Sequence, residues 1–219
     1  MDLARTLERG SFDSLFLADV VGMYDVYGGS ADAALRSAAQ VPILDPMMLI
    51  PAMATVTERL GFAVTAAVTY EQPYALARRF STLDHLTKGR VGFNVVTSYL
   101  ESAARNLGLK TQLDHDQRYD LADEFLDVVY RLWESSWEDD ALLVDRTHGI
   151  YADPEKVHDI AFVGEYFSVP GKHLVNPSPQ RTPVIFQAGA SARGGQFAAR
   201  HGEGVFINGM RKDIAGKLV

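Results

Sequence analysis

The sequence predicts an α/β protein whose parallel sheet forms part of a (β/α)8 TIM barrel. Short apolar runs rich in β-branched and aromatic residues alternate along the chain with longer segments of helical periodicity. This alternation favours a parallel sheet covered by helices. Five good strands are present, whereas a closed barrel of this type needs eight. We therefore expect the middle of a barrel rather than a whole one.

Each predicted strand ends in polar or turn residues. The strands are residues 14–19, 62–69, 90–96, 183–188 and 204–208. In parallel α/β folds the carboxyl ends of the strands share one face, and ligands bind there. Polar side chains at or just beyond these ends are Asp19, Thr69, Asn94, Thr97, Ser191 and Asn208. Strands also end in polar turns without any function, so these positions favour a site but do not identify its ligand.

Helices are predicted between the strands from apolar periodicity and from the residues at their ends. They are residues 3–9, 46–60, 73–87, 116–133 and 191–201, with a short helix around Glu101. Gly10 and Gly61 follow the first two helices, and Pro46 lies near the start of the second, as helix ends favour. One face of the longest helix is apolar and holds Leu121, Phe125, Val128, Val129 and Leu132.

Two segments lack a regular pattern. Residues 20–45 are rich in Gly, Asp, Ala and Tyr, which predicts a long loop. Residues 135–182 are far longer than an ordinary connection, so we expect an excursion that passes over a site. Within it, the run GEYFSVPG is a candidate hairpin. We interpret residues 1–219 as a single partial barrel domain that includes this excursion.

Composition excludes several classes of site. The 21 Lys and Arg residues against 28 Asp and Glu residues give a net charge of −7, which disfavours a nucleic-acid surface. The absence of cysteine excludes disulfides, thiolate metal sites and cysteine nucleophiles. The sequence shows no basic-then-apolar leader, no apolar run of membrane-span length, no GxSxG motif and no metal-ligand spacing of histidines. We expect a cytoplasmic protein that binds neither membrane nor metal.

Two polar clusters are candidates for ligand binding. GASARGG, residues 189–195, follows a strand and opens a helix, so its backbone N–H groups and Ser191 could contact a phosphate. A Ser N-cap with glycines for packing explains the same pattern. His115 and Tyr119 lie four residues apart at the start of a helix, and the face that they share could bracket a polar cofactor. An exposed helix start is the plainer alternative.

Other titratable residues in the helices are interpreted as structural. Asp114 or Asp116 could cap the helix that begins near His115. His85 lies inside a helix, four residues before a turn glycine, where packing or an interaction with the helix dipole is expected. Asp84 is assigned a structural role as well.

The chain resembles the bacterial luciferase-like flavin monooxygenases, and within them the group that includes nitrilotriacetate and dibenzothiophene-sulfone monooxygenases. The resemblance is carried by blocks such as FDSLFLAD, LTKGRVGFNVVTSYLESAARN, HDQRYDLADEFLDVVYRLWESSWED and TPVIFQAGAS, and it covers nearly the whole chain. It implies a (β/α)8 barrel that binds reduced FMN (FMNH2) and oxidises a small organic substrate with O2 through a flavin peroxide. It also implies a separate NAD(P)H:flavin reductase that supplies FMNH2, and a homo-oligomer.

The resemblance also assigns the flavin contacts, while no catalytic side chain is assigned. They are Asp19 as the site residue after the first strand, Thr65 as a flavin-contacting Ser/Thr, Asn94 near the isoalloxazine, His115 and Tyr119 on the phosphate side, and Ser191 as the phosphate-binding serine. These assignments favour Thr65 over Thr69, and they favour the cofactor role of the His–Tyr pair over an exposed helix start.

The sequence departs from the family pattern in two ways. Phe93 stands where a Trp usually precedes the Asn, and since an aromatic ring is retained we expect little change. A strand before the first helix and a long C-terminal portion are missing, which indicates a fragment or a truncated relative. A non-catalytic remnant and a deazaflavin-dependent oxidoreductase are the alternatives, although HDQRYD favours FMN. Organosulfur compounds and aminopolycarboxylates are the candidate substrates.

Overall fold

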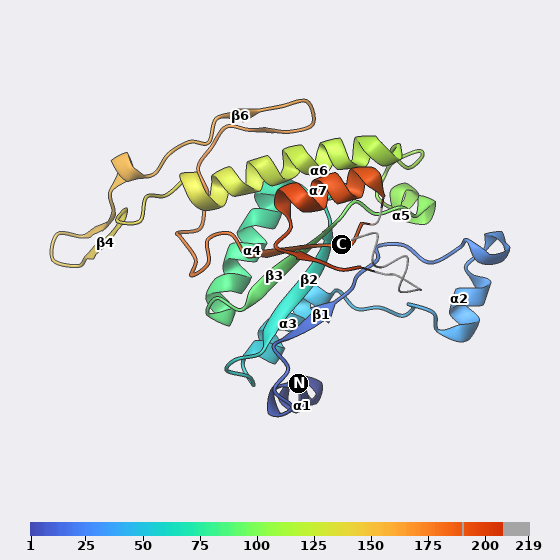
Figure 1. Ribbon diagram of the computed structural model, residues 1–219. Coiled ribbons are helices and arrows are strands. Elements are labelled where there is room, and N and C mark those ends of the chain that lie inside the picture. The colour runs from blue at the N-terminus through green and yellow to red at the C-terminus, as the bar shows by residue number, and fades with distance from the viewer. Residues whose placement is uncertain (190, 208–219) are drawn as a thin grey trace.

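The computed structural model describes residues 1–189 and 191–207 of the chain. At its centre is a five-stranded sheet with the strand order β1-β2-β3-β8-β9 (Figure 1). The strands are β1 (Ser14–Leu17), β2 (Gly61–Ala67), β3 (Val91–Val96), β8 (Val184–Gln187) and β9 (Gly204–Val205). Every neighbouring pair in this sheet is parallel, which confirms the predicted strands and their direction.

The register gives the sheet two different faces. Val64, Phe93 and Ile185 are aligned across β2, β3 and β8, and all three are fully buried beneath helices. Thr65 and Asn94 are aligned one residue further along. Because successive side chains of a strand point to opposite faces, these two polar residues lie on the other face, which we call the inner face.

Helices cover the outer face of the sheet (Figure 1). α3 (Pro46–Ala54), α4 (Pro73–Thr87) and α7 (Ala192–His201) contact the strands, and α6 (His115–Tyr130) packs against α4 and α7. Two further helices are α1 (Asp2–Arg9), which precedes β1, and α5 (Glu101–Asn106), which follows β3. In the core, the rings of Phe80 and Phe93 have centroids 4.4 Å apart, and Trp133 packs edge-on against Phe80. The predicted apolar face of α6 is buried in this core, which confirms it.

Three segments differ from the sequence prediction. α3 ends at Ala54 instead of residue 60, because the N–H groups of residues 58–60 all donate to the Glu8 carboxylate on α1. The long helix passes after Tyr130 into a π-helical turn, η2 (Arg131–Ser135). The predicted loop 20–45 contains a 3-10 turn, η1 (Tyr27–Gly29), and the short helix α2 (Asp32–Ser37), which extends away from the sheet (Figure 1).

The excursion at residues 135–182 forms two hairpins. β4 (Leu142–Asp145) pairs with β5 (Ile150–Ala152), and β6 (Phe162–Val163) pairs with β7 (Ser168–Val169), with the 3-10 turn η3 (Pro154–Lys156) between them. The second hairpin contains the predicted GEYFSVPG turn. The Glu124 carboxylate on α6 accepts hydrogen bonds from the N–H groups of residues 165–167. The second hairpin is therefore fixed beside α6, and the excursion does not cover the strand ends as expected (Figure 1).

Candidate functional site

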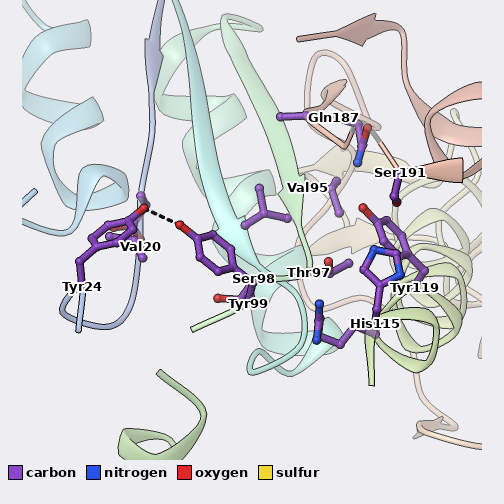
Figure 2. A pocket seen from close by; sticks show the side chains of 14 residues that line it. Val20, Tyr24, Val95, Thr97, Ser98, Tyr99, His115, Tyr119, Gln187 and Ser191 are labelled. Atoms are coloured by element: carbon purple, nitrogen blue, oxygen red, sulfur yellow. Dashed lines mark hydrogen bonds between the residues drawn. The ribbon is translucent and has the colours of Figure 1, made fainter. Parts of the chain in front are cut away.

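The carboxyl ends of the strands border a cleft of about 330 Å³ (Figure 2). Its walls come from the segment after β1, the end of β3, the first turns of α6, and the turn between β8 and α7. The lining residues are Asp19, Val20, Tyr24, Val95, Val96, Thr97, Ser98, Tyr99, His115, Arg118, Tyr119, Gln187, Ala188 and Ser191. A second hollow of about 290 Å³ adjoins this cleft at Asp19, which lines both.

The six predicted flavin contacts fall into two groups that meet at Asp19. Asp19, His115, Tyr119 and Ser191 line the cleft. Thr65 lines the adjoining hollow, and its Oγ1 accepts a 2.8 Å hydrogen bond from Nδ2 of the buried Asn94. We call Asp19, Thr65 and Asn94 the strand group. The helix group is His115, Tyr119, Ser191 and one further residue, Arg118.

The remaining polar strand ends have other positions. Thr97 lines the cleft, and its carbonyl oxygen accepts a 2.6 Å hydrogen bond from Oγ1 of Thr69. Thr69 therefore joins the segments that follow β2 and β3, and the assignment of Thr65 as the site residue stays a prediction. Asn208 lies outside the described residues.

Arg118 is a member of the helix group that the sequence analysis missed. It is 8% exposed and lines the cleft. Its Nη1 donates a 2.6 Å hydrogen bond to the carbonyl oxygen of Leu113, but its buried Nε has no partner among the described residues. Within residues 1–189 and 191–207, no carboxylate forms an ion pair with it. A buried cation without a counter-ion is costly, so this side of the cleft favours an anion.

Ser191 and two glycines shape the corner of the cleft around the Tyr119 hydroxyl. Ser191 is the N-cap of α7, and its Oγ accepts a 3.0 Å hydrogen bond from the N–H of Gly194, which confirms the predicted cap. A Cβ at Gly189 or Gly194 would lie only 2.6 or 2.7 Å from the Tyr119 hydroxyl. Glycine at both positions therefore leaves room for this hydroxyl next to the positive end of the α7 dipole.

His115 is the first residue of α6 and is half exposed. Its Nδ1 lies 2.6 Å from Oδ1 of Asp116, and its ring centroid lies 5.2 Å from that of Tyr119. Asp114 occupies the N-cap position of α6, but its side chain makes no capping hydrogen bond. Neither carboxylate caps the helix as expected, because Asp116 pairs with His115 instead.

The other side of the cleft is lined by Asp19 and by the pair Tyr24 and Tyr99. Figure 2 shows the two tyrosines pointing toward one another. Burial raises the pKa of Asp19 above its ordinary value; the charge of Asp45 adds to this rise, whereas a hydrogen bond from the N–H of Val20 opposes it. The Tyr99 hydroxyl donates a 2.9 Å hydrogen bond to that of Tyr24. Burial and this contact raise the pKa of Tyr99 to about 12, so Tyr99 is neutral at physiological pH.

Gln187 is a second lining residue that the sequence analysis missed. It ends β8, is buried, and its Oε1 accepts a 2.8 Å hydrogen bond from the N–H of Gly189. This bond fixes the turn that leads to Ser191. The sequence signal that could have identified Gln187 is its polar side chain near the end of the apolar PVIFQA strand.

The residues interpreted as structural lie away from the cleft. Asp84 is buried and accepts a 2.8 Å hydrogen bond from the N–H of Gln180, which ties the excursion to α4. His85 lies in the last turn of α4, with its Nε2 3.2 Å from the carbonyl oxygen of Asn176. In the described part of the chain, no helix is long and apolar enough to cross a membrane, and no group of three metal-ligating side chains is assembled.

Comparison with known proteins decides the family. Residues 1–219 match the family model described as luciferase-like monooxygenase. The chain belongs to the luciferase-like monooxygenase family. Dibenzothiophene-sulfone monooxygenase and nitrilotriacetate monooxygenase component A are among its matches, which confirms the resemblance found in the sequence.

Two relatives are similar over almost the whole chain. A long-chain alkane monooxygenase from Geobacillus thermodenitrificans (strain NG80-2) is 62% identical over 213 residues, which are 97% of this chain and 48% of that protein. A dimethyl-sulfide monooxygenase from Hyphomicrobium sulfonivorans is 64% identical over 206 residues, which are 94% and 43% of the two chains. The luciferase-like chain described here thus spans about half the length of these relatives.

Solved structures support the same fold. A long-chain alkane monooxygenase superposes with a TM-score of 0.97 at 60% identity, covering 99% of this chain and 50% of that one. A riboflavin lyase, solved with a modified FMN and riboflavin, superposes with a TM-score of 0.90 at 45% identity, covering 96% and 47%. The predicted luciferase-like barrel fold is therefore confirmed, and the curled five-stranded sheet is a part of such a barrel.

Proposed function

We propose that these residues form the flavin-binding part of a monooxygenase that uses FMNH2 and O2 to oxidise a small organic substrate. The observation that carries the proposal is the buried guanidinium of Arg118 in the wall of the cleft, with which no carboxylate of residues 1–189 or 191–207 forms an ion pair. Ser191 at the N-terminus of α7 and the Tyr119 hydroxyl lie in the same wall. A flavin phosphate offers the negative charge and the acceptor oxygens that these groups favour.

The strand group supports binding of the flavin ring at the other end. Within the described part of the chain, Oδ1 of Asn94 is a buried acceptor without a partner, while its Nδ2 donates to Thr65. The pyrimidine edge of an isoalloxazine carries an N–H donor between two carbonyl acceptors, so it can satisfy a buried acceptor of this kind. Asp19, which lines both hollows, would lie between the two ends of the cofactor.

Bound FMNH2 supplies the oxygen chemistry, and the protein contributes binding, orientation and exclusion of water. His115, Arg118, Tyr119 and Ser191 would hold the phosphate, and Asp19, Thr65 and Asn94 would hold the ring.

We propose an organosulfur or similar apolar substrate, since relatives are named for dimethyl sulfide, dibenzothiophene sulfone and alkanes. A separate NAD(P)H:flavin reductase would supply FMNH2; one relative is named as component A of its system. A homo-oligomer is proposed as well.

The test is an oxygenation assay with the full-length protein that contains these residues. FMN, NADH, a flavin reductase and O2 are supplied with dimethyl sulfide, dibenzothiophene sulfone, an alkane or nitrilotriacetate, and products are measured by mass spectrometry. We expect an oxygenated product only when protein and reductase are both present. Flavin binding without any product would favour the non-catalytic alternative. Failure to bind FMN, or tighter binding of a deazaflavin, would overturn the proposal.

A further inference from the structure

We propose that Arg193 is a positioning residue that fixes Tyr119 and Ser191 relative to one another, so that both hydroxyls address one phosphate. The proposal rests on the proposed flavin function of the cleft. Tyr119 is on α6, whereas Ser191 caps α7, so their relative position depends on how the two helices are joined. Arg193 lies in the first turn of α7, two residues after Ser191.

Arg193 joins the two helices through one nitrogen atom. Its Nη2 donates to Oδ1 of Asp120 at 2.9 Å and to Oδ2 of Asp123 at 2.5 Å. These acids lie one turn apart on α6: Asp120 directly follows Tyr119, and Asp123 lies four residues after it. The side chains of Arg193 and Asp123 are only 20% and 18% exposed. Such a partly buried, charge-assisted contact constrains geometry more than an exposed ion pair does.

Arg193 also contacts the tyrosine itself. Its guanidinium carbon lies 5.6 Å from the centroid of the Tyr119 ring, within the range of a cation–π interaction. The Phe197 ring, one turn further along α7, lies 5.5 Å from the same ring. Gly194 leaves space for the hydroxyl between these two contacts. The Tyr119 ring is therefore contacted by two residues of α7, and Arg193 is the charged one.

Asp123 extends the contact to the far end of α7. Its Oδ1 accepts a 2.7 Å hydrogen bond from Nε2 of His201 and a 3.4 Å contact from Nη1 of Arg200. Burial alone would raise the pKa of Asp123, but the hydrogen bonds from Arg193 and His201 outweigh it and hold the pKa below its ordinary value. Asp123 is thus ionised at neutral pH and anchors both ends of α7.

Arg200 provides a matched control for Arg193. Both arginines are on α7 and both reach Asp123, but the Arg200 side chain is 60% exposed. Arg200→Gln therefore removes the same charge and a contact to the same acid without touching the contact between Arg193 and Tyr119. Arg193→Gln removes both the bridge and the cation–π contact, and Arg193→Lys retains the charge.

The experiment compares FMN and riboflavin, which differ only in the phosphate, by fluorescence titration of the full-length protein. We expect Arg193→Gln to weaken FMN binding about tenfold while riboflavin binding changes by less than about twofold. Arg193→Lys should recover part of the loss, and Arg200→Gln should bind both ligands like the unchanged protein. In a Tyr119→Phe background, Arg193→Gln should add little, because the hydroxyl that it positions is gone.

A second readout does not depend on flavin. The Tyr119 ring signals in the NMR spectrum of tyrosine-labelled protein, identified with Tyr119→Phe, should shift in Arg193→Gln and stay unchanged in Arg200→Gln. Equal losses of FMN and riboflavin binding, or unchanged Tyr119 signals in Arg193→Gln, would overturn the positioning role. If the unchanged protein bound no flavin, the proposed function would fail, and the NMR comparison would still decide whether Arg193 fixes Tyr119.

Discussion

The helix group and the strand group are held in place by different kinds of interaction. The helix group, His115, Arg118, Tyr119 and Ser191, lies on α6 and at the N-cap of α7, and the relative position of its members depends on side-chain contacts between those helices. In the strand group, the register of β2 and β3 places Thr65 beside Asn94, and Asp19 follows the end of the neighbouring β1. Because of this difference, a substitution can affect binding of the flavin phosphate without affecting placement of the flavin ring, and the reverse. FMN and riboflavin share a ring and differ in charge, so they test each group independently.

Arg118→Met should have the largest effect. A buried cation bound to a phosphate contributes about 2–3 kcal/mol, so FMN affinity should fall roughly 30- to 150-fold. Riboflavin affinity should hardly change. The flavin-free variant should melt at least as high as the unchanged protein, because a buried charge without a counter-ion has been removed. Titration with both flavins and a thermal melt provide the check, and unchanged FMN affinity would remove Arg118 from the site.

Ser191→Ala should have the next largest effect. Loss of the hydroxyl should weaken FMN binding about tenfold, and loss of the N-cap should lower the free energy of unfolding by about 1 kcal/mol. Ser191→Asp separates the two roles, because Asp caps helices well but repels a phosphate. It should restore the stability and bind FMN no better than the alanine variant. Recovery of FMN binding in Ser191→Asp would mean that Ser191 acts only as a cap.

Thr65→Val probes the strand group with a side chain of similar shape. It leaves Nδ2 of the buried Asn94 without its acceptor, which should cost about 1–3 kcal/mol of unfolding free energy. FMN and riboflavin affinities should fall together, by roughly threefold to tenfold. Denaturant unfolding and the two titrations measure both effects. A loss confined to FMN would contradict the separation of ring and phosphate.

Asp19→Asn should have the smallest effect, and it should depend on pH. Because burial raises the pKa of Asp19, its ionisation is harder in the folded state than in the unfolded state. This residue therefore lowers stability as the pH rises from its ordinary pKa through the raised one. Melting temperatures of the two proteins should agree near pH 3, and the asparagine variant should melt higher at pH 7. A gap that instead closed toward pH 7 would contradict this environment.

The sequence predicted those features that depend on local pattern. The strands are apolar runs with polar ends, and the Ser191 cap needs only the residues that follow it, so both were correctly expected. The predicted end of α3 was wrong, because the N–H groups of Glu58 and Arg59 donate to Glu8, which lies about fifty residues earlier in the chain. The path of the excursion also depends on a residue distant in the sequence, because the N–H of Tyr166 in its second hairpin donates to Glu124 on α6.

Arg118 shows why a part of the candidate site could not be predicted. Its spacing from His115 puts it on the same side of α6, and this was visible in HDQRYD. Its burial, and the lack of an ion pair with any carboxylate of the described residues, depend on tertiary structure and are not recorded in a local pattern. The bridge from Arg193 to Asp120 and Asp123 also joins residues about seventy positions apart.

The most direct test of the central claim is the ratio of riboflavin to FMN dissociation constants, measured for the unchanged full-length protein, Arg118→Met and Thr65→Val. The two-group account predicts that the unchanged protein binds FMN at least about thirtyfold more tightly than riboflavin. The ratio should collapse toward one in Arg118→Met and stay unchanged in Thr65→Val. Equal binding of both flavins by the unchanged protein, or a collapse of the ratio in Thr65→Val, would contradict the account.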